Sequence, residues 1–141
     1  MVPGVDGRKM SKSYDNTLEI FAPPKQAKKQ IMRIVTDSTP VEDPKDPSTC
    51  NVFALLKLVA DPAELTEWET RYRSGGMGYG DAKKRLAELM MDYFEPYRQK
   101  REDLNKNLDY VHEVLAKGAD RAKAVARETL NKARVAVGLG A

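Results

Sequence analysis

The stretch CNVFALLKLVA, residues 50–60, is apolar except at Asn51 and Lys57. A helix that is apolar on nearly every side needs neighbours on all of those sides, because exposed apolar surface is unfavourable in water. The stretch therefore predicts the central helix of a bundle, and the segments on either side should supply the surrounding helices.

Two further helices are predicted beside this central one. The first should span residues 24–37, which begin with a proline suited to the first helical position and continue with apolar residues at helical spacing. The second should begin at Asp61-Pro62, where the carboxylate can cap the first turn. It should end at the glycine cluster of residues 75–80, whose spacing does not match a phosphate-binding Gly-x-Gly-x-x-Gly loop.

The remainder of the chain also has helical periodicity. A long helix is predicted from Asp81 towards Leu104, with a kink at Pro96, which lacks a backbone donor. Asn107 can cap a short helix, Gly118 is predicted to break it, and residues 119–137 should form the last helix. No segment alternates like a strand, so the predicted fold class is all-α, a helical bundle preceded by an irregular loop over residues 1–23.

Composition narrows the class of protein. The 141 residues are 41% hydrophobic and have a formal net charge of +3, which fits one globular domain and excludes a polycation. Cys50 is the single cysteine, so a buried thiol in a reducing compartment is expected. No window is apolar enough to span a bilayer and no signal peptide is evident, so we expect a soluble cytoplasmic protein with no membrane partner.

The first loop contains the sequence KMSKS at residues 9–13, which follows Gly4 and Gly7 and precedes Tyr14-Asp15-Asn16. It places two ammonium groups on either side of a Met-Ser pair, and the two glycines offer backbone freedom for the loop to close. Two ammonium groups in one loop can converge on a polyphosphate, where they would stabilise negative charge. The pentapeptide resembles the signature loop of class I aminoacyl-tRNA synthetases.

This resemblance assigns roles to the loop. In amino-acid activation by that family, a carboxylate attacks the α-phosphate of ATP and pyrophosphate leaves. The resemblance implies that Lys12, and after it Lys9, are the catalytic residues that stabilise the departing phosphates. It also implies ATP contacts from all five residues, Lys9, Met10, Ser11, Lys12 and Ser13, with Met10 packing against the domain to set the position of the loop.

Sequence beyond the loop is similar to one branch of that family. Residues 31–38 (IMRIVTDS), residues 78–83 (GYGDAK) and the alanine-rich end before Gly138 resemble bacterial tryptophanyl-tRNA synthetases. The resemblance implies the carboxy-terminal part of such an enzyme. Residues 1–23 would then be the end of the catalytic domain with the signature loop, and residues 24–141 the helical carboxy-terminal domain that binds the tRNA anticodon region.

The same resemblance implies ligands and partners. The full-length enzyme would use ATP, Mg²⁺, tryptophan and tRNA(Trp) and would be a homodimer. The family's second signature, a pair of histidines, cannot be here because His112 is the single histidine. We therefore expect the isolated chain to be inactive and to bind no cofactor tightly, and we expect no metal site, with His112 at the surface or in packing.

Basic residues of the last predicted helix leave two interpretations open. Lys123, Arg127 and Arg134 form one stripe beside Arg121 and Lys132, and such a stripe is either a solvated helix face or a contact surface for tRNA phosphates. Two alternative functions also stay open. One is a stand-alone, non-catalytic RNA-binding helical module, and the other is a structural bundle with a fortuitous signature loop.

Overall fold

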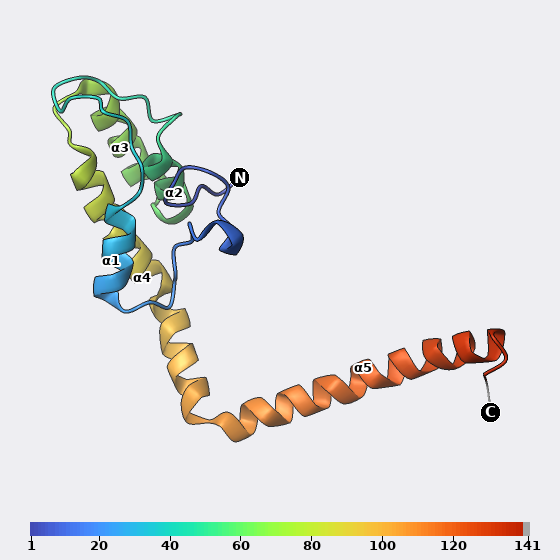
Figure 1. Ribbon diagram of the computed structural model, residues 1–141. Helices are drawn as coiled ribbons and strands as arrows, with labels where there is room; N and C mark the ends of the chain where they lie inside the picture. Colours follow the sequence, from blue (N-terminus) through green and yellow to red (C-terminus); the bar gives the residue numbers. More distant parts are fainter. Residues whose placement is uncertain (140–141) are drawn as a thin grey trace. The chain divides into compact units, whose positions relative to one another are not determined.

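The computed structural model describes residues 1–139 and is helical, which confirms the all-α prediction (Figure 1). Within these residues there are five α-helices, one 3₁₀ turn and no strand; Pro3 and Lys9 form an isolated antiparallel bridge. The helical elements are η1 (Lys12–Tyr14), α1 (Pro24–Met32), α2 (Asn51–Val59), α3 (Pro62–Ser74), α4 (Tyr79–Lys106) and α5 (Leu108–Ala136).

Two compact units divide the chain, Met1–Pro96 and Tyr97–Ala141. The first contains the predicted central helix and the KMSKS loop, and the second contains the end of α4 and all of α5. This division follows the density of packing, and the functional boundary between residues 23 and 24 stays a prediction.

The core of the first unit surrounds α2, as its sequence predicts. Four of its nine residues are buried, and Phe53 of α2 packs edge-on against Tyr72 of α3 with ring centroids 5.2 Å apart. Trp68 and Tyr72 of α3 are 5% and 0% exposed, so both belong to the core. Further core residues come from the loops and from α1 and α4, namely Leu18, Ile31, Ile34, Cys50, Met77, Ala82, Leu86 and Ala87.

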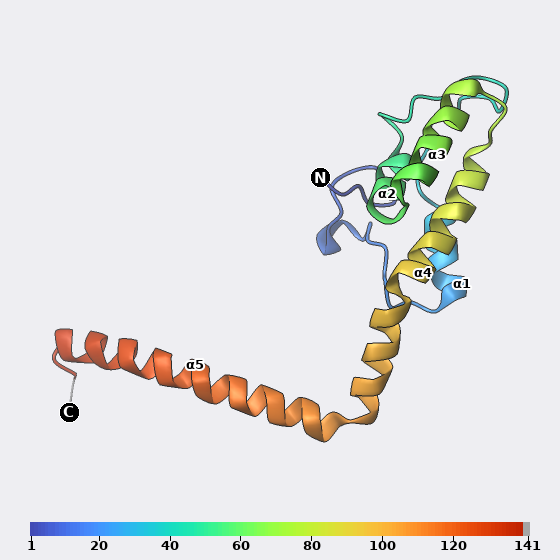
Figure 2. The ribbon, with the colours of Figure 1, turned by 180° about the vertical axis from the view of Figure 1, so that it is seen from behind.

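Local signals explain where α3 lies and how it contacts α4. The Asp61 carboxylate accepts a hydrogen bond from the Glu64 amide at 2.9 Å, and Pro62 follows the cap, as predicted. Glu64 also receives two hydrogen bonds from the Arg85 guanidinium of α4, at 2.6 and 3.0 Å. This bidentate pair lowers the pKa of the Glu64 carboxyl and joins the two helices, which Figure 2 shows as neighbours.

The loop between α1 and α2 is folded around a buried lysine. Lys45 is 3% exposed, and its ammonium donates to the carbonyl oxygens of Pro40, Val41 and Asp43. The Lys45 backbone N–H donates to the Tyr72 carbonyl at 2.7 Å. Three carbonyl acceptors satisfy an ammonium that would otherwise be costly to bury. The loop is therefore an ordered covering of the α3 end.

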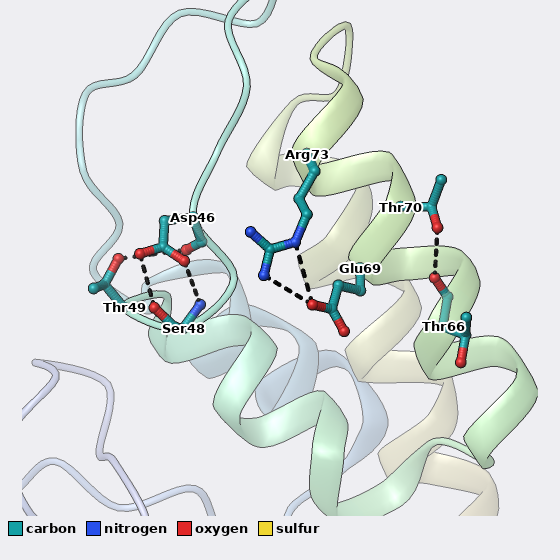
Figure 3. A network of polar contacts seen from close by, with 7 residues as sticks. All are labelled: Asp46, Ser48, Thr49, Thr66, Glu69, Thr70 and Arg73. Carbon is teal, nitrogen blue, oxygen red and sulfur yellow. Dashed lines mark hydrogen bonds and ion pairs between the residues drawn. The ribbon is translucent and has the colours of Figure 1, made fainter.

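A capped turn ends this loop, as Figure 3 shows. The Asp46 carboxylate accepts hydrogen bonds from the Ser48 amide and hydroxyl at 2.8 and 2.7 Å, which lower its pKa. Arg73 extends from α3 on the side of this turn and pairs with Glu69 at 2.9 Å. Its positive charge adds to the effect on Asp46.

One predicted boundary is wrong because of contacts remote in sequence. The first helix ends at Met32, not near Asp37. After the turn at Arg33, the Val35 N–H donates to the Val5 carbonyl at 2.8 Å, and the Val35 carbonyl accepts from the Asn51 side chain at 3.1 Å. If α1 continued to Val35, the Val35 N–H would form its hydrogen bond within the helix and could not donate to Val5. These tertiary hydrogen bonds therefore end α1 early.

The predicted break at Gly118 is also wrong. α5 is continuous from Leu108 to Ala136, and Asn107 caps it by accepting from the Tyr110 amide at 3.3 Å. A glycine in a helix interior costs only about 1 kcal/mol relative to alanine, so flanking helix formers outweigh it. α4, by contrast, continues past Pro96 to Lys106, as predicted.

We predict that Gly75→Ala destabilises the first unit by about 2 to 4 kcal/mol, measured by urea unfolding. Gly75 ends α3 with φ of 74°, and a Cβ there would lie 2.3 Å from the Glu42 carbonyl oxygen. Gly76 has a φ of 75° but open space around it, so Gly76→Ala is the matched control and should cost about 1 kcal/mol. Equal losses in the two variants would contradict the steric role of the Glu42 contact.

Candidate functional site

Short-range hydrogen bonds shape the signature loop, residues 9–13. The Met10 N–H donates to the Val2 carbonyl at 2.9 Å, and Ser11 is the N-cap of the 3₁₀ turn η1. The Ser11 hydroxyl accepts from the Ser13 amide at 3.2 Å. Asp15 then adopts the left-handed conformation with φ of 50°, which aspartate tolerates better than most residues and which turns the chain back towards the loop.

Asn16 follows the signature loop in the sequence, and its side chain is hydrogen-bonded to the loop backbone. It is 1% exposed, and its side-chain oxygen accepts from the Ser11 amide at 2.8 Å. Its side-chain nitrogen donates to the Lys9 carbonyl at 3.1 Å and to the Asp6 carboxylate at 2.7 Å. Every polar atom of this buried carboxamide is thus hydrogen-bonded to the segment before it.

The two glycines before the loop have different roles. Gly7 has a φ of 80°, which agrees with the expected need for backbone freedom. At Gly4, a Cβ would lie 2.4 Å from Asn16 Cγ and 2.5 Å from the Asn16 carbonyl oxygen. Gly4 therefore serves close packing against Asn16, a role that backbone freedom alone does not describe.

Charged groups flank the carboxamide. The Arg8 guanidinium pairs with Asp6 at 2.6 Å and lies 4.9 Å from the centre of the Tyr14 ring. The pKa of the Asp6 carboxyl lies below its ordinary value, first because of the hydrogen bond from Asn16 and then because of Arg8. Asp6 therefore stays ionised under acidic conditions in which free aspartate takes up a proton.

Contacts with the helical core position the loop as a whole. Met10 and Val5 pack against the core cluster, which confirms the packing role expected for Met10. The Val5 carbonyl accepts from the Val35 amide, and the Val5 amide donates to the Asn16 carbonyl at 2.9 Å. The signature loop is consequently attached to the helices through both side-chain packing and backbone pairing.

Both lysines of the loop are exposed. Within residues 1–139, neither the Lys9 nor the Lys12 ammonium has a hydrogen bond or ion pair. Uncommitted ammonium groups on an ordered backbone can accept an anionic ligand without first breaking an internal salt bridge. The catalytic roles of Lys9 and Lys12, and the ATP contacts of Met10, Ser11 and Ser13, stay predictions.

The basic stripe of α5 is exposed, as is His112. Lys132 pairs with Glu128 at 2.8 Å. In the described part of the chain, Lys123, Arg127 and Arg134 have no ion pair or side-chain hydrogen bond. The three unpaired cations fit both a solvated face and a phosphate-binding face.

Sequence analysis missed the part played by Asn16. The residue stands in the Tyr14-Asp15-Asn16 stretch that accompanies the signature, but asparagine at a turn is common and its partners cannot be deduced from spacing. The aspartate at position 15, a residue type that tolerates the left-handed conformation, and the glycine at position 4 are the signals that could have indicated a tight turn.

Comparison with known proteins identifies the family. The family model of class I tRNA synthetases (W and Y) matches residues 1–95, and the chain belongs to this family. Among its relatives are tryptophan–tRNA ligases from Rhodopirellula baltica, 54% identical over 138 residues, and from Fusobacterium nucleatum, 45% identical over 139 residues. These matches cover 98% and 99% of the length of this chain, but only 43% and 42% of the length of the two relatives.

Solved structures agree with this placement. The chain is 46% identical to tryptophanyl-tRNA synthetase from Campylobacter jejuni, whose crystal structure is complexed with ADP and tryptophan. The TM-score is 0.87, with 98% of the chain and 43% of that structure covered. The chain thus spans less than half the length of the relatives it matches. In residues 1–139 no helix is both long and apolar enough to cross a membrane.

We predict that Asn16→Ala raises the pKa of Asp6 towards its ordinary value, because the largest stabilising contact of the carboxylate is removed. A folded-state pKa below the unfolded value contributes stability that is present at neutral pH and lost as the pH falls through the folded-state pKa. Side-chain carboxyl NMR titration of the two proteins measures the shift, with Asp46 as the internal control. An unchanged Asp6 titration would contradict the assigned hydrogen bond.

Proposed function

We propose that this chain forms the carboxy-terminal part of a tryptophan–tRNA ligase. The observation that supports it best is the signature loop, in which an ordered backbone presents two uncommitted lysines in a chain of the class I family. Relatives that match almost all of the chain are tryptophan–tRNA ligases, which favours tryptophan as the amino acid and tRNA(Trp) as the acceptor.

The loop acts on the leaving group of amino-acid activation. As the tryptophan carboxylate attacks the α-phosphate of ATP, the bond to pyrophosphate breaks and negative charge grows on the departing oxygens. Lys12 contacts these oxygens first and Lys9 supports it, while the Ser11 amide is already engaged by Asn16 and keeps the turn in place. Mg²⁺ bound to the phosphates supplies further charge neutralisation.

Lysine suits this role because its ammonium is a mobile point charge. The Lys9 and Lys12 side chains are exposed, so they can follow the phosphates as the bond lengthens, while the backbone beneath them stays fixed. Charge that interacts more strongly with the breaking bond than with bound ATP lowers the barrier and changes substrate affinity less.

The helical remainder contacts tRNA. Lys123, Arg127 and Arg134 on α5 offer three exposed cations that phosphate oxygens can pair with, and within residues 1–139 none of them has an ion pair with a carboxylate. Phosphate contacts of this kind position the nucleic acid without reading its bases. The full-length ligase is a cytoplasmic homodimer in this proposal.

Lys12→Ala in the full-length ligase should lower the rate of tryptophan-dependent ATP–pyrophosphate exchange by about 100-fold, with a much smaller change in the KM for tryptophan. The lost charge acts mainly while the phosphate bond breaks, which is why the rate falls further than the affinity. Pyrophosphate exchange with purified protein measures both quantities.

Lys28→Ala is the control, because Lys28 is an exposed lysine of α1 outside the loop. The 141-residue chain alone should show no exchange, since the tryptophan pocket is expected elsewhere in the ligase. Exchange by the isolated chain, or full activity of the Lys12→Ala ligase, would refute the assignment.

Replacing Lys123, Arg127 and Arg134 together by alanine should weaken tRNA binding and reduce the slope of log affinity against log salt by about 2 to 3. Each lost phosphate contact no longer releases a counterion, so the slope falls with the number of contacts. Filter binding or fluorescence anisotropy over a salt series measures it.

Removing the same number of charges from α1, at Lys25, Lys28 and Lys29, provides the matched control. If both triple variants change the slope equally, net charge and not the α5 face determines binding. An unchanged slope in the α5 variant supports the solvated-face interpretation.

A further inference from the structure

We propose that Asn16 is a positioning residue for the activation step, because its buried carboxamide fixes the backbone on which Lys9 and Lys12 stand. This inference rests on the proposed function of the signature loop and adds a residue outside the five-residue signature. Asn16 does not contact the reacting atoms itself; it acts through the conformation of the loop.

The hydrogen bonds of Asn16 span the segment that separates the two lysines. At one end its side-chain nitrogen donates to the Lys9 carbonyl at 3.1 Å, and at the other its oxygen accepts from the Ser11 amide at 2.8 Å. Ser11 is the N-cap of the turn that begins with Lys12. One side chain therefore sets the spacing between Lys9 and the start of the Lys12 turn.

Only a carboxamide satisfies both ends of this arrangement. The Ser11 amide is a donor and needs an oxygen, whereas the Lys9 carbonyl is an acceptor and needs an N–H. An aspartate has the same shape, but its second oxygen would face the Lys9 carbonyl and the Asp6 carboxylate. An alanine would leave the Ser11 amide and the Lys9 carbonyl without their partner, which is costly for groups in a poorly solvated position.

The surroundings fix the orientation of the carboxamide. The Asp6 carboxylate accepts from the same nitrogen at 2.7 Å, which excludes the flipped amide, and Arg8 holds Asp6 through its ion pair. Gly4 leaves no room on the other side, because its hypothetical Cβ would lie 2.5 Å from Asn16 Nδ2. A buried, fully bonded and sterically enclosed side chain gives a single loop conformation.

These contacts belong to the loop and not to the helical core. The partners of the carboxamide are Asp6, Lys9 and Ser11, while the core is formed by residues such as Phe53 and Tyr72. A substitution that preserves the volume of Asn16 should therefore displace the lysines and leave the helices folded.

The test is Asn16→Asp in the full-length ligase. We expect the maximal rate of tryptophan-dependent ATP–pyrophosphate exchange to fall by about 10- to 100-fold, as when reacting groups are misplaced by about 1 Å. The KM for tryptophan should change by less than about threefold, because the tryptophan pocket is not altered. Asn107→Asp is the matched control, since it makes the same change at the cap of α5, in the second unit, where an oxygen can still accept from the Tyr110 amide.

A pH series separates positioning from loss of fold. A protonated aspartic acid at position 16 can donate a hydrogen bond to the Lys9 carbonyl while accepting from Ser11, so the activity of the variant relative to the unchanged ligase should rise as the pH falls. The charged groups beside that position are the Asp6 carboxylate and, through it, the Arg8 guanidinium. A relative activity that is independent of pH, or an unchanged maximal rate, would overturn the proposal.

Hydrogen exchange in the 141-residue chain tests the loop without reference to catalysis. Asn16→Ala should speed exchange of the Ser11 amide by about 5- to 30-fold, while the amide of the core residue Leu56 keeps its rate. Equal Ser11 rates would overturn the structural half of the proposal even if the ligase is active. If the unsubstituted full-length ligase shows no ATP–pyrophosphate exchange, the proposed function is refuted, and with it the positioning role of Asn16.

Discussion

The packing of the buried Tyr72 side chain is the interaction on which the rest of the first unit depends. Its ring is fully buried against Phe53 of α2 and lies 6.1 Å from the Tyr79 ring at the start of α4. Its hydroxyl is 3.5 Å from the Cys50 sulfur, and its carbonyl receives the Lys45 amide. One aromatic residue of α3 thus contacts both neighbouring helices and the long loop, and burial raises the pKa of its hydroxyl so that it remains neutral.

The helical core transmits this order to the signature loop through a short series of contacts. Asn51, the first residue of α2, donates to the Val35 carbonyl, and the Val35 amide donates to Val5. Val5 in turn donates to the carbonyl of Asn16, whose side chain is hydrogen-bonded to Lys9 and Ser11 of the loop. The loop backbone is therefore hydrogen-bonded to the rest of the first unit, even though its lysine side chains are exposed.

In the proposed function, that combination suits the loss of pyrophosphate from ATP better than either a fully mobile or a fully packed loop. An ordered backbone would limit the entropy lost on binding ATP, and the free ammonium groups of Lys9 and Lys12 could follow developing charge. Asp6 pairs with Arg8 beside Asn16, so this carboxylate does not occupy the ammonium group of either lysine. The second unit contributes exposed cations on α5, which are suited to a nucleic-acid partner that is large and anionic.

Sequence alone determined the helical class, the central position of residues 50–60, the cap at Asp61 and the identity of the signature loop, because periodicity, capping and motif are properties of neighbouring residues. Tertiary structure alone decided that α1 ends at Met32 and that the Asn16 side chain is hydrogen-bonded to the loop backbone. In both cases the outcome depends on which distant polar group offers the better hydrogen bond, and sequence spacing does not specify that partner.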